Sequence, residues 1–154
     1  MKKALPVIEG LNQILADSTV FYQKLRHYHW NVNGRHFYEL HLKFEELYTQ
    51  WALSIDAVAE RILMLDGVPL HTLASILHQA KIEEDDTIPS ATAMVKAIVA
   101  DLRVIHRMAG DVITLAEQAA DRGTANMLDG LRDAMDKDLW MFEAWSKDAA
   151  KAWT

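Results

Sequence analysis

The sequence contains no cysteine, only 3 prolines and 6 glycines, and no long apolar run. The missing cysteines exclude a disulfide scaffold, a thiolate metal site and a cysteine nucleophile. The short apolar runs argue against a membrane-spanning helix, and no apolar signal core follows the first residues. We therefore expect a cytoplasmic protein, or a nucleoid-associated one, that has no membrane partner.

The composition is typical of a single globular domain that covers residues 1–154. Hydrophobic residues make up 51% of the chain and charged residues 25%. The formal net charge is −6. An acidic chain is poorly suited to tight, non-specific binding of nucleic acid, because the phosphates are negative as well.

Apolar residues recur every three or four positions in four long stretches, which predicts four helices and an all-α fold. The expected boundaries are the turn at Asn31–Gly34, Gly67 with Pro69, Pro89 with the N-cap Ser90, and the break at Gly123-Thr124. A short apolar piece, Leu73–Leu77, lies in the longest connection and predicts one or two extra helical turns. The long crossover between the second and third helices predicts an up-down-down-up, ferritin-like four-helix bundle.

The second helix, expected from about residue 37 to residue 66, carries polar side chains beside its apolar stripe. At about 100° per residue, His41 and Glu45 lie on one flank near its beginning, and Asp56 and Glu60 lie on that flank near its end. Each pair has i,i+4 spacing, so its two side chains can reach one ion. Imidazole with carboxylate suits iron, manganese or zinc. The same pattern also fits a solvated helix face.

The two pairs are too far apart to form one site within one chain. His41 and Asp56 are separated by 15 residues, or about 22 Å along a helix. Ferritin-like bundles with an internal di-metal site use Glu-x-x-His motifs, and no histidine here has a glutamate three residues before it. This argues against an intrasubunit di-iron oxidase or a haem bacterioferritin.

Two chains offer an alternative arrangement. If the second helices of two subunits cross antiparallel about a two-fold axis near Gln50 and Trp51, residues whose numbers sum to 101 come together. The histidine pair of one subunit then meets the carboxylate pair of the other, at two identical sites about 22 Å apart. The small side chain of Ala52 on this flank would allow a close approach.

Two more histidines, His27 and His29, lie where the first helix is expected to end. Either or both could complete the coordination of a metal ion. The alternative is that they interact with the helix dipole or are half-buried without a ligand role.

These motifs together resemble the Dps family, the DNA-protection-during-starvation proteins or miniferritins. The resemblance is carried by His29-Trp30-Asn31-Val32-Asn33-Gly34, by His41 with an acid four residues later, and by Asp56-Ala57-Val58-Ala59-Glu60-Arg61. It extends over nearly the whole chain. It implies a dodecameric homo-oligomeric shell that oxidises ferrous iron, usually with hydrogen peroxide in preference to dioxygen. It further implies that the shell stores the ferric mineral and so protects DNA.

The resemblance also implies a set of site residues. His29, His41 and Glu45 of one subunit would bind iron together with Asp56 and Glu60 of its partner, forming a di-iron ferroxidase centre. Trp30 would lie beside the centre, where it could supply an electron and quench radicals. The alternative for Trp30 is a packed core aromatic.

The sequence departs from the family pattern in three ways. Glu45 stands where the family usually has aspartate, which lengthens one ligand by a methylene. Asn126 replaces an aspartate of the pore, which leaves Asp121, Asp129 or Asp133 to attract iron. Only Lys2 and Lys3 precede the first helix, so we expect weak or absent DNA binding. The competing hypothesis is a structural or DNA-compacting shell with little iron chemistry.

Overall fold

The computed structural model describes residues 4–151, and the side chains of residues 4–147. Within this range the chain is helical and contains no strand. Its five helices are α1 (Leu5–Asn31), α2 (Phe37–Met64), α3 (Leu73–Gln79), α4 (Ala91–Gln118) and α5 (Arg122–Lys151). The all-α prediction is confirmed, with the short additional helix where it was expected. Lys2 and Lys3 lie outside the described residues.

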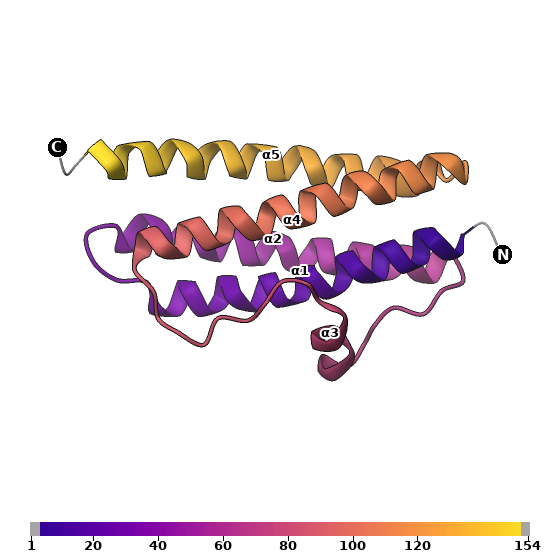
Figure 1. Cartoon of the computed structure of the whole chain (residues 1–154), viewed down its shortest axis with the longest axis horizontal. Helices are drawn as coiled ribbons and strands as arrows, with labels where there is room; N and C mark the ends of the chain where they lie inside the picture. The colour runs from indigo at the N-terminus through magenta and orange to yellow at the C-terminus, as the bar shows by residue number, and fades with distance from the viewer. Residues whose placement is uncertain (1–3, 152–154) are drawn as a thin grey trace.

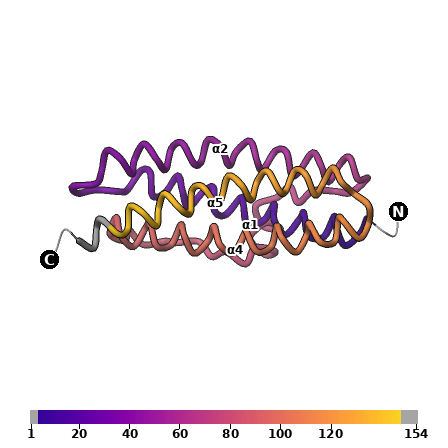
Figure 2. The backbone as a smooth tube through the Cα atoms, turned by 90° about the horizontal axis from the view of Figure 1, so that it is seen from above, coloured from indigo at the N-terminus to yellow at the C-terminus, as the bar shows by residue number. Residues whose placement is uncertain are grey.

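The four long helices form an up-down-down-up bundle (Figure 1). α1 and α2 are antiparallel neighbours joined by a short turn, and α4 and α5 form the second antiparallel pair. The crossover from α2 to α4 runs along the bundle and carries α3, which packs on α1. Seen from above, α2 lies at one side of the bundle (Figure 2). The crossover therefore does not cover the outer side of α2.

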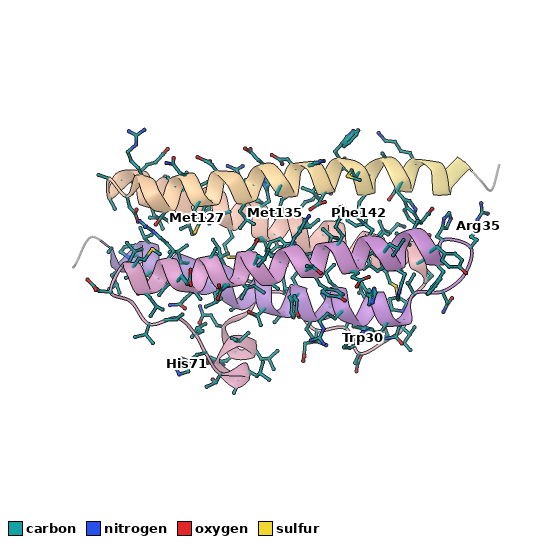
Figure 3. The ribbon with its side chains drawn as sticks, turned by 180° about the vertical axis from the view of Figure 1, so that it is seen from behind. Trp30, Arg35, His71, Met127, Met135 and Phe142 are labelled. Carbon is teal, nitrogen blue, oxygen red and sulfur yellow. The ribbon has the colours of Figure 1, made fainter. Side chains whose placement is uncertain are left out.

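The core is built from the apolar positions that recur along each helix. Phe21, Phe44 and Leu102 are completely buried. The ring of Phe21 meets that of Trp51 edge-on, with centroids 5.2 Å apart, which ties α1 to α2. From α5, Met135 and Phe142 point toward the other helices (Figure 3). None of the described helices combines the length and the apolarity that a membrane crossing requires.

The ends of α2 and α4 differ in detail from the sequence-based expectation. Asp66, not Gly67, adopts the left-handed conformation after α2, with φ 60°. Gly67 is needed for another reason, because a Cβ there would lie 2.8 Å from a methyl group of Ile8. The break after α4 is at Ala120, also at φ 60°, and Gly123 already lies inside α5. Schellman-type hydrogen bonds stabilise both ends, because they satisfy carbonyls that the helix leaves free.

Side-chain hydroxyl groups cap the beginnings of α3 and α4. The hydroxyl of Ser90 accepts a hydrogen bond from the backbone N–H of Ala93 at 3.2 Å, which confirms Ser90 as an N-cap. Thr72 accepts in the same way from the N–H of Ser75. α3 extends two residues beyond the predicted Leu73–Leu77 piece.

Two aspartates attach the crossover to the bundle. Asp17 on α1 is completely buried, and one of its oxygens accepts the backbone N–H groups of Lys81 and Ile82 at 2.6 and 2.7 Å. Asp85 accepts hydrogen bonds from Thr87 and from the hydroxyl of Tyr28. These bonds favour the ionised carboxylate and lower the pKa of Asp85 to about 2. Burial, followed by the bond to Asp85, raises the pKa of Tyr28.

Replacing Asp17 by alanine should destabilise the protein by about 3 kcal/mol, because the backbone N–H groups of Lys81 and Ile82, the second of them buried, lose a charged acceptor. The free energy of unfolding of the assembled protein in denaturant measures the effect. Asp111→Ala is the matched control, since Asp111 is exposed on α4. An equal, small loss in both variants would show that Asp17 does not hold the crossover.

Candidate metal centre

His29 and His41 face each other across the α1–α2 turn in a reciprocal arrangement. The Nδ1 of His29 lies 2.8 Å from the backbone carbonyl of His41, and the Nδ1 of His41 lies 2.8 Å from the carbonyl of His29. The rings are stacked, with centroids 3.8 Å apart and planes inclined by 16°. The last turn of α1 is therefore joined to the first turns of α2 through both side chains.

This arrangement determines which ring nitrogen can bind a metal ion. A carbonyl oxygen can only accept, so each Nδ1 must carry the hydrogen. In the neutral form, the Nε2 of each ring is then left with a free lone pair. A backbone carbonyl that orients the other nitrogen is the usual support for a metal-binding histidine. The chemistry of both histidines thus fits a ferrous ion.

The predicted carboxylate ligands all lie on α2 and are exposed. Glu45 follows His41 by one turn, and Asp56 and Glu60 lie toward the other end of the helix. Among the described side chains, none forms an ion pair with these three carboxylates. Nor do any three histidine, aspartate or glutamate side chains in that part of the chain come together as a metal site. One protomer thus offers two separated groups of ligand-type side chains.

The same outer side of α2 exposes large apolar side chains. Leu42 is 62% exposed, Leu53 72% and Leu63 57%. At helical spacing they lie on the flank that carries Glu45 and Asp56. Exposed leucines gathered along one helix face are typical of a surface that packs against another protein.

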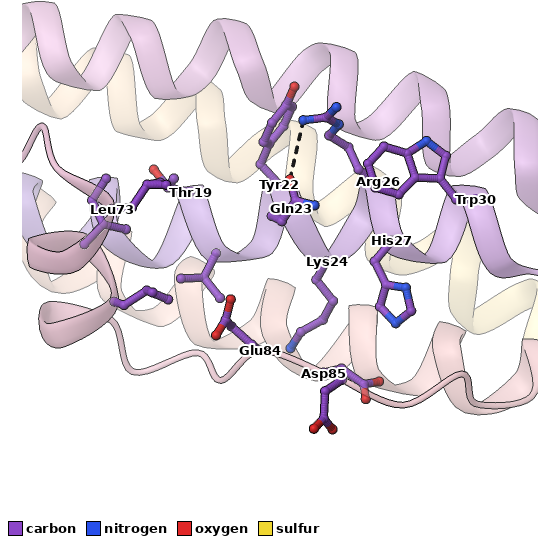
Figure 4. A pocket seen from close by; sticks show the side chains of 14 residues that line it. Thr19, Tyr22, Gln23, Lys24, Arg26, His27, Trp30, Leu73, Glu84 and Asp85 are labelled. Atoms are coloured by element: carbon purple, nitrogen blue, oxygen red, sulfur yellow. Dashed lines mark hydrogen bonds between the residues drawn. The ribbon is translucent and has the colours of Figure 1, made fainter.

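Trp30 does not lie in the core. It is 56% exposed, and the guanidinium of Arg26 lies over its ring at 4.9 Å from the centroid. Both residues line a groove of about 800 Å³ between α1 and the crossover (Figure 4). The core-aromatic alternative for Trp30 is therefore wrong for the single protomer.

The structure adds two aromatic residues that the sequence analysis did not single out. Phe37 stacks on His41 with centroids 4.9 Å apart, and Tyr48 meets His29 edge-on at 5.3 Å. Tyr48 follows His41 by seven residues, which is two helical turns, so its place on this flank was readable from the sequence. Its contact with His29 was not, because that contact joins two helices.

One of the acids expected to attract iron at a pore is already engaged. Asp121 caps the beginning of α5 through the N–H of Thr124 and pairs with the guanidinium of Arg61. Burial alone would raise the pKa of Asp121, but the bonds from Thr124 and Arg61 outweigh burial and lower it. The carboxylate of Asp121 is thus engaged within the protomer, and the expectation that Asp121, Asp129 or Asp133 attracts iron stays a prediction. Asp129 and Asp133 are exposed, as is Asn126.

His27 also has a structural role. Its Nε2 lies 2.7 Å from the backbone carbonyl of Thr87 in the crossover, and its Nδ1 lies 2.9 Å from the side-chain amide of Asn31. Both ring nitrogens are therefore engaged, and His27 does not join the pair formed by His29 and His41.

Comparisons with known proteins agree with this architecture. A family model described as a ferritin-like domain matches residues 8–152. The DNA protection during starvation protein of Brevibacillus brevis is 44% identical over 137 residues, which are 87% of this chain and 90% of that protein. General stress protein 20U of Bacillus subtilis is 37% identical over 139 residues, 90% of this chain and 96% of that protein.

Solved structures are similar over the same range. The Dps protein of Vibrio cholerae, described as a member of a broad superfamily of ferritin-like diiron-carboxylate proteins, superposes with a TM-score of 0.91 at 35% identity. The match covers 94% of this chain and 91% of that one. A Dps protein from Bacillus brevis gives a TM-score of 0.91 at 40% identity and covers 94% and 97% of the two chains. The chain described here therefore belongs to the Dps family of ferritin-like proteins.

Proposed function

We propose that this protein is a ferroxidase miniferritin, in which two subunits together bind the ferrous ions that are its substrate. His29, His41 and Glu45 of one subunit act with Asp56 and Glu60 of its partner. The observation that carries the proposal is the reciprocal histidine pair, because it leaves two oriented Nε2 atoms next to an exposed helix face. The unpaired carboxylates on that face also support the proposal, because they are available to bind the same ions.

The reaction is the two-electron reduction of hydrogen peroxide by two ferrous ions. Each ion gives one electron, the O–O bond breaks, and two protons are taken up to give two molecules of water. Neutral imidazoles suit the ferrous substrate, and the carboxylates stabilise the ferric product through their charge. The ferric product is stored in the cavity of a dodecameric shell, and removal of iron and peroxide protects DNA.

Helix geometry supports sites shared between subunits. The histidine and carboxylate groups on α2 lie about 22 Å apart along the helix, so they cannot bind the same ion. Antiparallel contact of two α2 helices would bring Glu45 near the partner's Asp56 and would cover Leu42 and Leu53 in the same step. An isologous dimer of this kind has two equivalent sites.

Mixing two defective variants tests the shared site. His29→Ala/His41→Ala lacks the histidine half, and Asp56→Ala/Glu60→Ala lacks the carboxylate half, so each shell alone should oxidise iron no faster than buffer. After dissociation and random co-assembly, about one quarter of the sites regain both halves. Ferric absorbance after addition of ferrous salt and peroxide should recover to that fraction. No recovery in mixed shells of normal size would show that each site lies within one chain.

Introducing a charge at Leu53 tests the α2 contact itself. Leu53→Glu should leave the protomer helical, because this side chain is exposed there, but it should prevent assembly because a carboxylate would be buried in the contact. Light scattering measures the assembly, and binding of cobalt(II) measures the site, whose ligands are unchanged. Leu53→Met is the matched control and should retain both. Cobalt binding by a monomeric Leu53→Glu variant would contradict the shared site.

The protein should bind DNA weakly, because a dodecamer of chains at −6 each repels phosphate. Plasmid retardation by purified shells at physiological salt measures this. Tight retardation, together with iron oxidation no faster than buffer, would favour the DNA-compacting alternative.

A further inference from the structure

We propose that Asn33 is a site of spontaneous deamidation, in which the backbone nitrogen of Gly34 displaces the side-chain amide as ammonia. The two residues lie in the turn that joins α1 to α2, and both are exposed. The function proposed above gives Asn33 no role. The modification does not depend on that function, whereas its expected effect on metal binding rests on it.

The backbone nitrogen of Gly34 is accessible. Gly34 has φ 91°, a conformation that residues with a Cβ rarely adopt. Apart from its chain neighbours, no described atom lies within 4 Å of the position that a Cβ would take. The carbonyl of Gly34 accepts the N–H of Phe37 at 3.1 Å, but its own N–H donates to no group among the described residues. Neighbouring Arg35 points away from the bundle at this end (Figure 3).

The structure restrains the other three of the four asparagines. Both ends of the Asn12 carboxamide are hydrogen-bonded to the backbone of the crossover, at 3.1 and 2.9 Å. The side-chain amide of Asn31 donates to the backbone carbonyl of His27 at 2.9 Å. Asn126 lies inside α5, where the following N–H belongs to the hydrogen bonds of the helix. The carboxamide of Asn33 has no such bond among the described residues, so it can turn toward the nitrogen of Gly34.

Two aspartates also precede glycine, and both pairs are protected. Aspartate can close the same succinimide ring with loss of water, so it too needs a free nitrogen in the next residue. After Asp66, the N–H of Gly67 donates to the carbonyl of Ile62 at 2.9 Å. Asp129-Gly130 lies inside α5. Asn33-Gly34 is therefore the pair that the fold leaves able to react.

The reaction needs no reagent except water. The nitrogen of Gly34 forms a bond to Cγ of Asn33, the bond from Cγ to Nδ2 breaks, and the backbone amide hydrogen leaves with Nδ2 as ammonia. The succinimide then takes up one water molecule at either of its carbonyls. Opening on one side gives aspartate. Opening on the other side gives isoaspartate, in which the main chain runs through the former side-chain carboxyl group.

The products change the turn that closes the histidine pair. Both products add a negative charge to a chain whose net charge is −6. Isoaspartate also lengthens the main chain by one methylene between α1 and α2, next to the buried Val32. His29 and His41 bind each other's carbonyls across this turn at 2.8 Å, so a longer connection should weaken both contacts.

Mass spectrometry of assembled shells, incubated at mildly alkaline pH and physiological temperature, tests the modification. Trypsin cleaves after Arg26 and Arg35, so a single peptide carries both Asn31 and Asn33. Deamidation raises its mass by about one dalton, and fragmentation assigns the increase to one of the two asparagines. We expect the increase at Asn33, with isoaspartate detected by an isoaspartyl methyltransferase. Shells digested without incubation give the background.

A synthetic peptide of residues 27–35, incubated in parallel, gives the rate without the fold. Similar conversion of Asn33 in the shell and in the peptide would support the proposal. Conversion in the peptide alone, or conversion of Asn31 as fast as that of Asn33, would overturn it. Asn33→Gln retains an amide but closes its ring far more slowly, so these shells should lose the mass increase. An unchanged increase in Asn33→Gln would also overturn the proposal.

Cobalt(II) binding measures the effect on the proposed metal site. Incubated shells should bind cobalt more weakly than fresh ones, whereas Asn33→Gln shells incubated in the same way should bind like fresh shells. Fresh Asn33→Asp shells carry the added charge without the longer main chain, and they should retain the original affinity. Equal weakening in Asn33→Asp would overturn the backbone explanation, and unchanged binding after conversion would overturn any effect on the histidine pair. Fresh shells that bind no cobalt would overturn the proposed function, and the mass measurement would still decide the deamidation.

Discussion

The reciprocal pairing of His29 and His41 is the contact on which the candidate site depends. Each imidazole uses its Nδ1–H to bind the backbone carbonyl of the other residue. The two bonds join the end of α1 to the beginning of α2, and they leave the same nitrogen free on both rings. The hydrogen bonds place the hydrogen of each neutral ring on Nδ1. Only a nitrogen with a free lone pair can bind a metal ion, so Nε2 is the atom available on both rings.

The two sides of α2 differ in burial. One buries Phe44, Leu47 and Ile62 in the bundle core. The other leaves carboxylates unpaired and leucines exposed, and the described part of the chain supplies nothing to cover them. Packing within the bundle does not explain why Leu53 is exposed beside Asp56. The proposed contact with a second copy would account for both the apolar and the acidic residues of this face.

The outer side of α2 is left uncovered because the crossover lies along α1. Its hydrogen bonds to Asp17 and Tyr28 hold it along α1, and α3 packs on α1 as well. The connection that could have covered α2 is thus kept on another side of the bundle. The buried carboxylate of Asp17 thus helps to keep the outer side of α2 uncovered, although it lies far from α2's exposed residues in the sequence.

The sequence alone determined the helices, their order and the separation of the two candidate ligand pairs on α2. These properties are local or follow from the rise of a helix, so periodicity and counting were sufficient. Only the tertiary structure decided that Asp66 and Ala120 take the left-handed positions, that Arg61 engages Asp121, and that Tyr48 lies against His29. Contacts between Arg61 and Asp121, or between Tyr48 and His29, depend on how helices distant in the chain pack together. A pattern read along one helix does not contain that information.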